Sequence, residues 1–275
     1  MEVKILQLIE GAKKAEGLTV IIDVFRAFST ACYVFNNGVN KIIPVGKLNT
    51  AYSLKEQDNS LILMGERAGK LLADFDYGNS PALIKDLDFS NKIVVHTTSA
   101  GTQGIVNAKN ASQIITASFV NAQAVVNYIM KKQPSRVSLV CMGIAGVETA
   151  DEDVLCALYL KNLIISQSLT DVNSLTEEDI DLLREMILNQ SAMSRVVQEE
   201  LLKSLLEGNT VSLLEREIIK KILKQGSGQR FFDPANKEWS PEGDFAMCLK
   251  FNIFDFVLKA EEYTEGLFSL RMVKS

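Results

Sequence analysis

The sequence predicts an α/β fold of three layers, in which helices cover both faces of a mostly parallel sheet, with a helical insertion in the C-terminal half. Short runs rich in β-branched residues alternate with segments of helical periodicity through the first 165 residues. This alternation is typical of parallel strands joined by crossover helices. Strand signals then almost disappear between residues 176 and 224, where the pattern predicts helices instead.

The predicted elements of the first part follow one another regularly. Apolar runs predict buried strands over residues 18–23, 41–45, 61–64, 92–97, 113–117 and 136–141. Helical periodicity predicts helices over residues 27–37, 101–108, 121–131 and 152–166. Gly38 supports the end of the first helix, because glycine readily adopts the left-handed backbone that closes a helix.

The second part divides at a glycine-containing loop. Helices are expected to begin near residue 176 and to cover residues 192–206 and 212–224. Residues 226–243 are predicted to form a loop, and residues 244–258 form an apolar, partly β-like run. We therefore expect an α/β core over residues 1–165 that holds most of the site motifs, a helical insertion over 166–226, and a C-terminal segment over 227–275 that rejoins the core.

Composition narrows the classes of function. The 275 residues have a net charge of −5 and no basic block, so nucleic acid is not an expected partner. The longest apolar stretches are shorter than a membrane span, and no signal-peptide pattern opens the chain, so we expect a cytoplasmic protein. The four cysteines are widely spaced beside apolar runs, which predicts buried reduced thiols rather than a zinc site.

Polar motifs follow four of the predicted strands. Asp23 and Arg26 follow the first strand, and Glu66 and Arg67 follow the third. The loop 97–102 follows the strand at 92–97, and the acidic run 151–153 lies beyond the strand at 136–141. Ligands of open parallel sheets bind at the carboxyl ends of the strands. The four motifs are therefore expected to converge on one site.

The side chains of these motifs suit an anion beside a metal ion. Carboxylate oxygens are the ligands that Mg²⁺ prefers, and the chain offers Asp23, Glu66, Asp151, Glu152 and Asp153. Arginines donate forked hydrogen bonds to phosphate or carboxylate, and Arg26 and Arg67 are candidates. Further donors for an anion are expected from Asn79, Ser80, Thr97, Thr98, Ser99, Gly101 and Thr102.

Each motif also has a purely structural interpretation. Asp23 could cap the helix that follows it, and Arg26 could pair with a surface acid. The acidic run at 151–153 could serve only the dipole of its helix. His96 is the only histidine, so a binuclear site with several histidines is excluded, and a neutral structural role for it is as reasonable as catalysis.

Taken in order, the motifs resemble those of one family. The segments IDVFRA (22–27), GER (65–67), FDYGNSP (75–81), TTSAGT (97–102), EDVLCA (152–157) and DFAMCL (244–249) resemble the 2-phosphosulfolactate phosphatase family over most of the chain. The resemblance is weakest between residues 176 and 224.

The resemblance implies Mg²⁺-dependent hydrolysis of 2-phosphosulfolactate to sulfolactate and phosphate, a step of coenzyme M biosynthesis. It implies catalytic roles for Asp23, Arg26, Glu66, Arg67 and Asp151, and metal binding by Asp23, Glu152 and Asp153. It also implies substrate contacts by Asn79, Ser80 and the loop from Thr97 to Thr102. The attacking group is left open between Asp23 and a water molecule on the metal.

Two other functions and one assembly stay open at this point. A non-catalytic binding protein for a small organic anion would keep the arginines but would not need the carboxylates. A metal-dependent lyase or isomerase would act on a phosphorylated hydroxy acid without releasing phosphate. Leucines 201, 202, 205 and 206 could pack on the chain's own core or on a second copy, and a homodimer is weakly expected.

Overall fold

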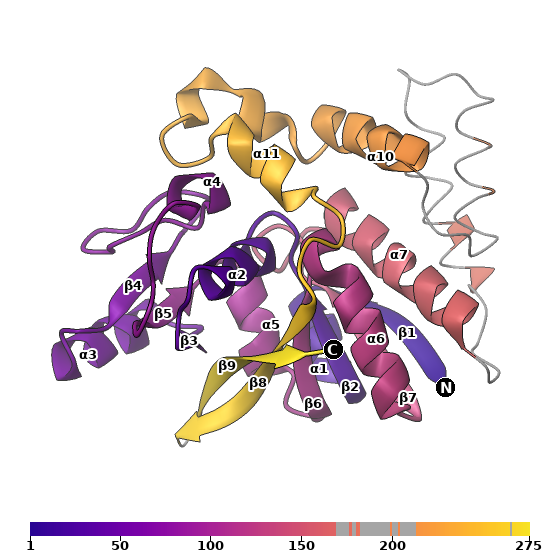
Figure 1. The fold of residues 1–275 in the computed structure, drawn as a ribbon, viewed down its shortest axis with the longest axis horizontal. Coiled ribbons are helices and arrows are strands. Elements are labelled where there is room, and N and C mark those ends of the chain that lie inside the picture. Colours follow the sequence, from indigo (N-terminus) through magenta and orange to yellow (C-terminus); the bar gives the residue numbers. More distant parts are fainter. Residues whose placement is uncertain (169–175, 178–179, 182–198, 200–202, 204–212, 265) are drawn as a thin grey trace.

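A nine-stranded mixed sheet forms the centre of the protein in a computed structural model that describes residues 1–168, 176–177, 180–181, 199, 203, 213–264 and 266–275 (Figure 1). Its strands are β1 (Glu2–Gln7), β2 (Gly17–Ile22), β3 (Lys41–Pro44), β4 (Ile62–Gly65), β5 (Ile93–Thr97), β6 (Ala111–Ala117), β7 (Arg136–Cys141), β8 (Phe256–Thr264) and β9 (Leu267–Lys274). Their order across the sheet is β1-β7-β2-β6-β8-β9-β3-β5-β4.

The helices of the described residues connect and cover these strands. They are α1 (Leu8–Lys14), α2 (Ala27–Asn36), α3 (Leu48–Gln57), α4 (Pro81–Ile84), α5 (Gly101–Asn107), α6 (Ala122–Lys132), α7 (Asp151–Gln167), α10 (Leu213–Gln225) and α11 (Glu242–Cys248). Short 3₁₀ turns lie at η1 (Phe119–Asn121), η2 (Gln229–Phe232) and η3 (Pro234–Asn236).

Two parallel groups of strands make up the sheet. Strands β1, β7, β2 and β6 form one group, and β3, β5 and β4 form the other. The antiparallel hairpin β8–β9 joins them: β8 pairs with β6, and β9 meets β3 at the single pair Ile42 and Leu270. The mostly parallel sheet is therefore confirmed, and its centre is occupied by a hairpin from the C-terminus.

Both faces of the larger group of strands are buried. Alternate residues of a strand point to opposite faces, so neighbouring residues enter different cores. In β2, Val20 and Ile22 face a core that includes residues of α6 and α7. Ile21 faces the opposite core, with residues of α1, α2 and α5. Figure 1 shows these two sets of helices on either side of the strands. The predicted three layers are thus confirmed.

A third, smaller core supports the group β3, β5 and β4. Ile43, Leu63 and Val95 pack there with Ala51 of α3. This small core holds β4 and β5 firmly, and the polar residues of the site follow directly after these two strands.

The six predicted strands and four predicted helices of the first 166 residues are present, with ends that differ by two residues or fewer. The sequence pattern did not predict β1, α1, α3 or the short helix α4. Strand β1 lies at the edge of the sheet and buries only Val3, so its apolar signal is weak. Helix α3 buries only Ala51, and its remaining surface is mixed in polarity.

The prediction of a partly β-like run over 244–258 was wrong in its first half, where helix α11 lies. Pro241 precedes this helix, and Glu242 and Asp244 occupy its first turn, where acidic residues favour a helix. Phe245 and Cys248 are buried on one face, with the spacing of a helix turn. Strand β8 begins only at Phe256.

Most of the predicted helical insertion lies outside the described residues, including the four leucines between 201 and 206. Helix α10 confirms the last of the three helices predicted there. The domain boundaries and the homodimer stay predictions. None of the four cysteines forms a disulfide, and all four are buried, as expected. None of the helices that the structure describes has both the length and the apolar character needed to span a bilayer.

Candidate active site

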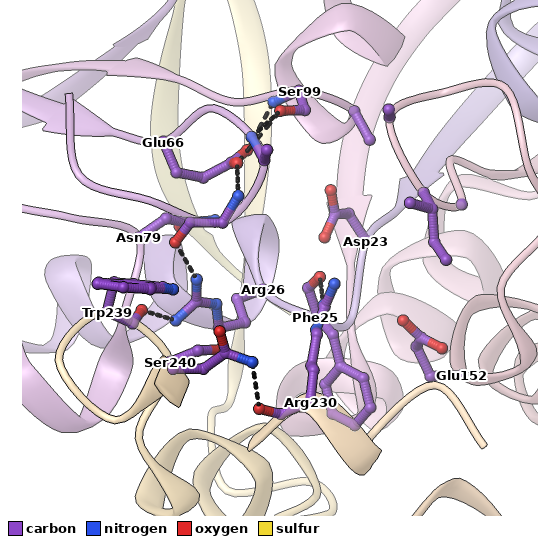
Figure 2. Close-up of a pocket in the computed structure, with 17 residues that line it drawn as sticks. Asp23, Phe25, Arg26, Glu66, Asn79, Ser99, Glu152, Arg230, Trp239 and Ser240 are labelled. Carbon is purple, nitrogen blue, oxygen red and sulfur yellow. Dashed lines mark hydrogen bonds between the residues drawn. The ribbon is translucent and has the colours of Figure 1, made fainter. Parts of the chain in front are cut away.

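A cavity of about 380 Å³ opens where loops after four strands of the sheet meet. The loops that follow β2, β4, β5 and β7 all contribute to its lining, so the predicted convergence is confirmed. The segment between α10 and α11 forms the remaining wall. The lining residues, shown in Figure 2, are Asp23, Phe25, Arg26, Glu66, Ala68, Gly69, Asn79, Ser99, Ala100, Gly143, Ile144, Ala145, Glu152, Arg230, Asn236, Trp239 and Ser240.

Asp23 stands at the end of β2 and points into this cavity (Figure 2). Its Oδ1 accepts a hydrogen bond from the backbone N–H of Ala27, the first residue of α2, at 2.9 Å, so a contact that caps this helix is present. No donor among the described residues reaches its Oδ2. Burial raises the pKa of Asp23 to about 7, and the charges of Glu66 and Glu152 add to this shift.

Glu152 is the second carboxylate that faces the cavity with a free oxygen. Its side chain is buried, and its Oε2 has no hydrogen-bond partner among the described residues. Burial raises the pKa of Glu152, while the Arg230 guanidinium opposes that shift. A buried carboxylate with an unpartnered oxygen is costly unless a cation or a proton satisfies it.

The two acidic neighbours of Glu152 do not line the cavity. Asp153 accepts hydrogen bonds from the backbone N–H groups of Val24 and Gly143, each at 2.8 Å, and so ties together the loops after β2 and β7. Burial, followed by the charges of Asp23 and Glu152, raises the pKa of Asp153 well above its usual range. Asp151 is partly exposed, and burial raises its pKa as well.

Glu66 holds two loops of the cavity wall in place. Its Oε1 accepts from the Ser99 N–H and its Oε2 from the Gly69 N–H, both at 2.7 Å. The Ser99 hydroxyl adds a third bond at 3.1 Å. Since the carboxylate already has three donors, its position favours a role in shaping the site.

Arg26 is held by protein groups on several sides. Its Nη1 donates to Asp244 Oδ2 and to the Trp239 carbonyl at 2.6 Å each, and its Nη2 donates to the Gly69 carbonyl at 3.1 Å. Arg26 therefore fastens the wall between α10 and α11 to the loop after β4. The acid that pairs with Arg26 is the fully buried Asp244, and not a surface acid as in the purely structural interpretation.

Arg67 does not line the cavity, although the sequence places it beside Glu66. Its guanidinium donates to the Glu66 carbonyl at 2.6 Å and to the Thr97 hydroxyl at 2.8 Å. Thr98 and Thr102 are engaged with each other through their hydroxyl and backbone N–H groups. These residues shape the loop after β5.

Ser99 and Ala100 are the residues of the loop 97–102 that line the cavity. Gly101 lies behind them, and a Cβ there would come within 2.7 Å of Asp23 Oδ2 and 2.6 Å of the Ala27 Cβ. Only glycine therefore allows the loop to approach Asp23 this closely.

Asn79 lines the cavity, and its Oδ1 accepts from His96 Nε2 at 3.2 Å. Burial and the Arg67 charge lower the pKa of His96 to about 4, so the ring is neutral near pH 7. Ser80 instead caps α4 and donates to Asp244 Oδ1 at 2.7 Å. Of the two residues in this turn, Asn79 is thus the one at the site.

The wall between α10 and α11 was not predicted from the sequence. It contributes Arg230, Asn236, Trp239 and Ser240 to the cavity. The sequence predicts a loop for this segment, because its glycines and prolines are typical of turns and no clear helical periodicity is present. One signal was available: the only tryptophan and an arginine next to two phenylalanines stand in a segment that is otherwise polar.

The fold and the cavity define an α/β protein with a pocket lined by carboxylates and arginines at the carboxyl ends of its strands. A family model described as 2-phosphosulpholactate phosphatase matches residues 3–263. The chain belongs to this family.

Curated relatives agree with the family. Proteins named "probable 2-phosphosulfolactate phosphatase" include one from Caldicellulosiruptor saccharolyticus, 39% identical over 154 residues, which are 54% of this chain and 63% of the relative. One from Thermotoga petrophila is 36% identical over 144 residues, 52% of this chain and 61% of the relative. One from Thermoplasma acidophilum is 31% identical over 170 residues, 62% of this chain and 75% of the relative. The aligned part thus spans less than two thirds of the first two relatives.

Proposed function

We propose that this protein is a phosphatase that hydrolyses 2-phosphosulfolactate, or a related phosphorylated hydroxy acid, with the help of Mg²⁺. The observation that carries the proposal is the pair of buried carboxylates, Asp23 and Glu152, that face one cavity together with Arg230. Family membership and the names of the relatives support the substrate class. The cavity volume of about 380 Å³ suits a small organic anion.

The residues present fit a magnesium ion. Mg²⁺ in enzyme sites is bound by one or two carboxylates, with water and substrate phosphate completing its shell. Asp23 and Glu152 would hold it, because each has an oxygen without a protein donor among the described residues. Among those residues no group of three acidic, histidine or cysteine side chains is close enough to hold a metal, so a site with two protein ligands is the form that we propose. When bound, the ion supplies positive charge to the phosphoryl oxygens.

The protein's own groups organise the reaction around this point. Glu66 fixes the loops at Gly69 and Ser99, and Asp153 fixes those at Val24 and Gly143. The amide of Asn79 is oriented by His96 and can donate its N–H groups to a substrate oxygen. The attacking group is either the Asp23 carboxylate or a water molecule. Rapid-quench trapping of a labelled phosphoenzyme distinguishes these two routes.

Phosphate release from a panel of phosphorylated hydroxy acids, headed by synthetic 2-phosphosulfolactate, tests the proposal. We expect release in the presence of Mg²⁺ and loss of release with EDTA. Tight binding of these compounds without phosphate release would instead support a binding protein. Conversion of a phosphorylated hydroxy acid into another compound without phosphate release would support a lyase or isomerase.

A further inference from the structure

Two cationic side chains line the described cavity, Arg26 and Arg230, and they differ in how their donors are used. Arg26 donates to Asp244, to the Trp239 carbonyl and to the Gly69 carbonyl. Its side chain is 3% exposed, and its charge is already matched by the buried Asp244 carboxylate. Arg26 therefore has little capacity left for a substrate anion.

Arg230 has donors to spare. Its Nη2 donates to the Phe25 carbonyl at 2.8 Å, and no other hydrogen bond or ion pair of its guanidinium occurs among the described residues. A guanidinium has five N–H donors. Several of them are thus available at the cavity, where Figure 2 shows Arg230 between the carboxylate side and the Trp239 side.

The position of Arg230 is fixed by its surroundings rather than by an acidic partner. Its guanidinium carbon lies 5.1 Å from the centre of the Phe231 ring, and Phe231 packs edge-on against Phe25 at 5.0 Å. Asn236 Nδ2 donates to the Arg230 carbonyl at 3.1 Å. The aromatic contacts and the backbone bond hold the cation in place before any ligand arrives, which lowers the entropy lost on binding.

The lining of the cavity places Arg230 at the carboxylate side. It lines the same cavity as Asp23 and Glu152, the two carboxylates with oxygens free of protein donors among the described residues. An anion bound in front of these carboxylates would meet their negative charge. It therefore requires a cation at this end of the cavity, and Arg230 is the described lining residue that can provide one.

We propose that Arg230 binds the phosphoryl group of the substrate, a role that the sequence analysis expected of Arg26 and Arg67. Its planar fork can donate two parallel hydrogen bonds to phosphoryl oxygens and can stabilise the negative charge that spreads over them during transfer. The substrate assignment rests on the proposed function, whereas binding of phosphate itself does not.

Calorimetric titration with inorganic phosphate, in EDTA and in Mg²⁺, tests the role of Arg230 without relying on turnover. We expect Arg230→Gln to weaken phosphate binding by about tenfold or more, and Arg230→Lys to restore part of the affinity because it keeps the charge but not the fork. The matched control is Lys237→Gln, which removes one charge from an exposed residue of the same segment and should bind phosphate like the wild type. Thermal unfolding of each variant shows whether the fold is retained.

Measurement of kcat distinguishes a failure of the role proposed for Arg230 from a failure of the proposed phosphatase function. If the wild type releases phosphate from substrate, kcat of Arg230→Gln should fall by roughly a hundredfold. Wild-type turnover together with unchanged phosphate affinity and kcat in Arg230→Gln would overturn the role of Arg230 alone. Phosphate binding that depends on Arg230, without turnover of any phosphoester, would refute the phosphatase and leave the role of Arg230 standing. A fall in kcat of Arg230→Gln that is confined to substrates with a sulfonate would assign Arg230 to the sulfonate instead. Absence of phosphate binding by the wild type would also refute the proposal.

Discussion

Asp244→Asn is expected to destabilise the protein strongly, because it removes the negative partner of a buried arginine. The side chains of Arg26 and Asp244 are 3% and 0% exposed, and Nη1 lies 2.6 Å from Oδ2. Asparagine keeps the shape of the side chain, and its oxygen can still accept from the Ser80 hydroxyl and the Ala82 N–H. The asparagine NH2 group would then take the place of Oδ2 opposite Arg26 Nη1, so the substitution removes the charge and the hydrogen bond from Arg26 together.

The magnitude follows from the burial of this pair. Removing one partner of a buried ion pair costs about 3–5 kcal/mol, because the remaining charge is left without compensation. The carbonyls of Trp239 and Gly69 still accept from Arg26, so we expect the lower end, about 3 kcal/mol. For a chain of this size that corresponds to a fall in Tm of roughly 6–12 °C.

Urea and thermal unfolding followed by circular dichroism measure the effect. Glu242→Gln is the matched control, because it removes an exposed charge from the same helix. Burial raises the pKa of Asp244, and the Arg26 charge with the hydrogen bonds from Ser80 and Ala82 opposes that shift. Unchanged stability in Asp244→Asn would show that the carboxyl is already protonated, and our account of the ion pair would be wrong.

Three further substitutions test groups in and around the cavity. Gly101→Ala should lower kcat/KM by about tenfold or more, because the new Cβ would press on Asp23 and Ala27. Glu152→Gln should leave the Tm in EDTA unchanged or raised, since it removes a buried charge, but should abolish the rise in Tm that Mg²⁺ produces in the wild type. The pKa of His96 is lowered to about 4, so the unfolded state takes up a proton before the folded state does as pH falls. The protein should therefore lose stability below pH 7. Relative to His96→Asn, the wild type should lose roughly 3 kcal/mol of unfolding free energy from pH 7 to pH 4.

Each of these predictions has a control or a contradicting result. Gly78→Ala places a Cβ no closer than 4.0 Å to its nearest neighbour and should leave kcat/KM unchanged. Glu148→Gln changes an exposed charge near the site and should keep the Mg²⁺-dependent rise in Tm. Parallel pH profiles of wild type and His96→Asn would show that the ring does not titrate as its burial requires.

The sequence predicted the parts of this protein that depend on local pattern. Strand β2 followed by Asp23, and β4 followed by Glu66, were visible because apolar runs end abruptly in polar residues. The convergence of four strand ends followed from the rule that ligands of parallel sheets bind at that edge.

The remaining parts depend on contacts between distant segments. The hairpin β8–β9 enters the middle of the sheet from the C-terminus, and no local pattern shows which strands it separates. Arg26 and Arg67 carry the residue type expected of an anion clamp, but Asp244 and Thr97 occupy their donors. Arg230 was not predicted, because its place at the cavity depends on where the segment between α10 and α11 folds back and not on its neighbours in sequence.

The most direct test of the central claim is the rate of phosphate release from 2-phosphosulfolactate by wild type and Asp23→Asn, each with Mg²⁺. Asparagine can still accept from the Ala27 N–H, so the fold should persist, and Asp255→Asn, at an exposed residue, is the control. The account predicts turnover by the wild type and by the control, and its loss in Asp23→Asn with an unchanged or raised Tm. Equal turnover by all three proteins would contradict the assignment of this cavity as the active site.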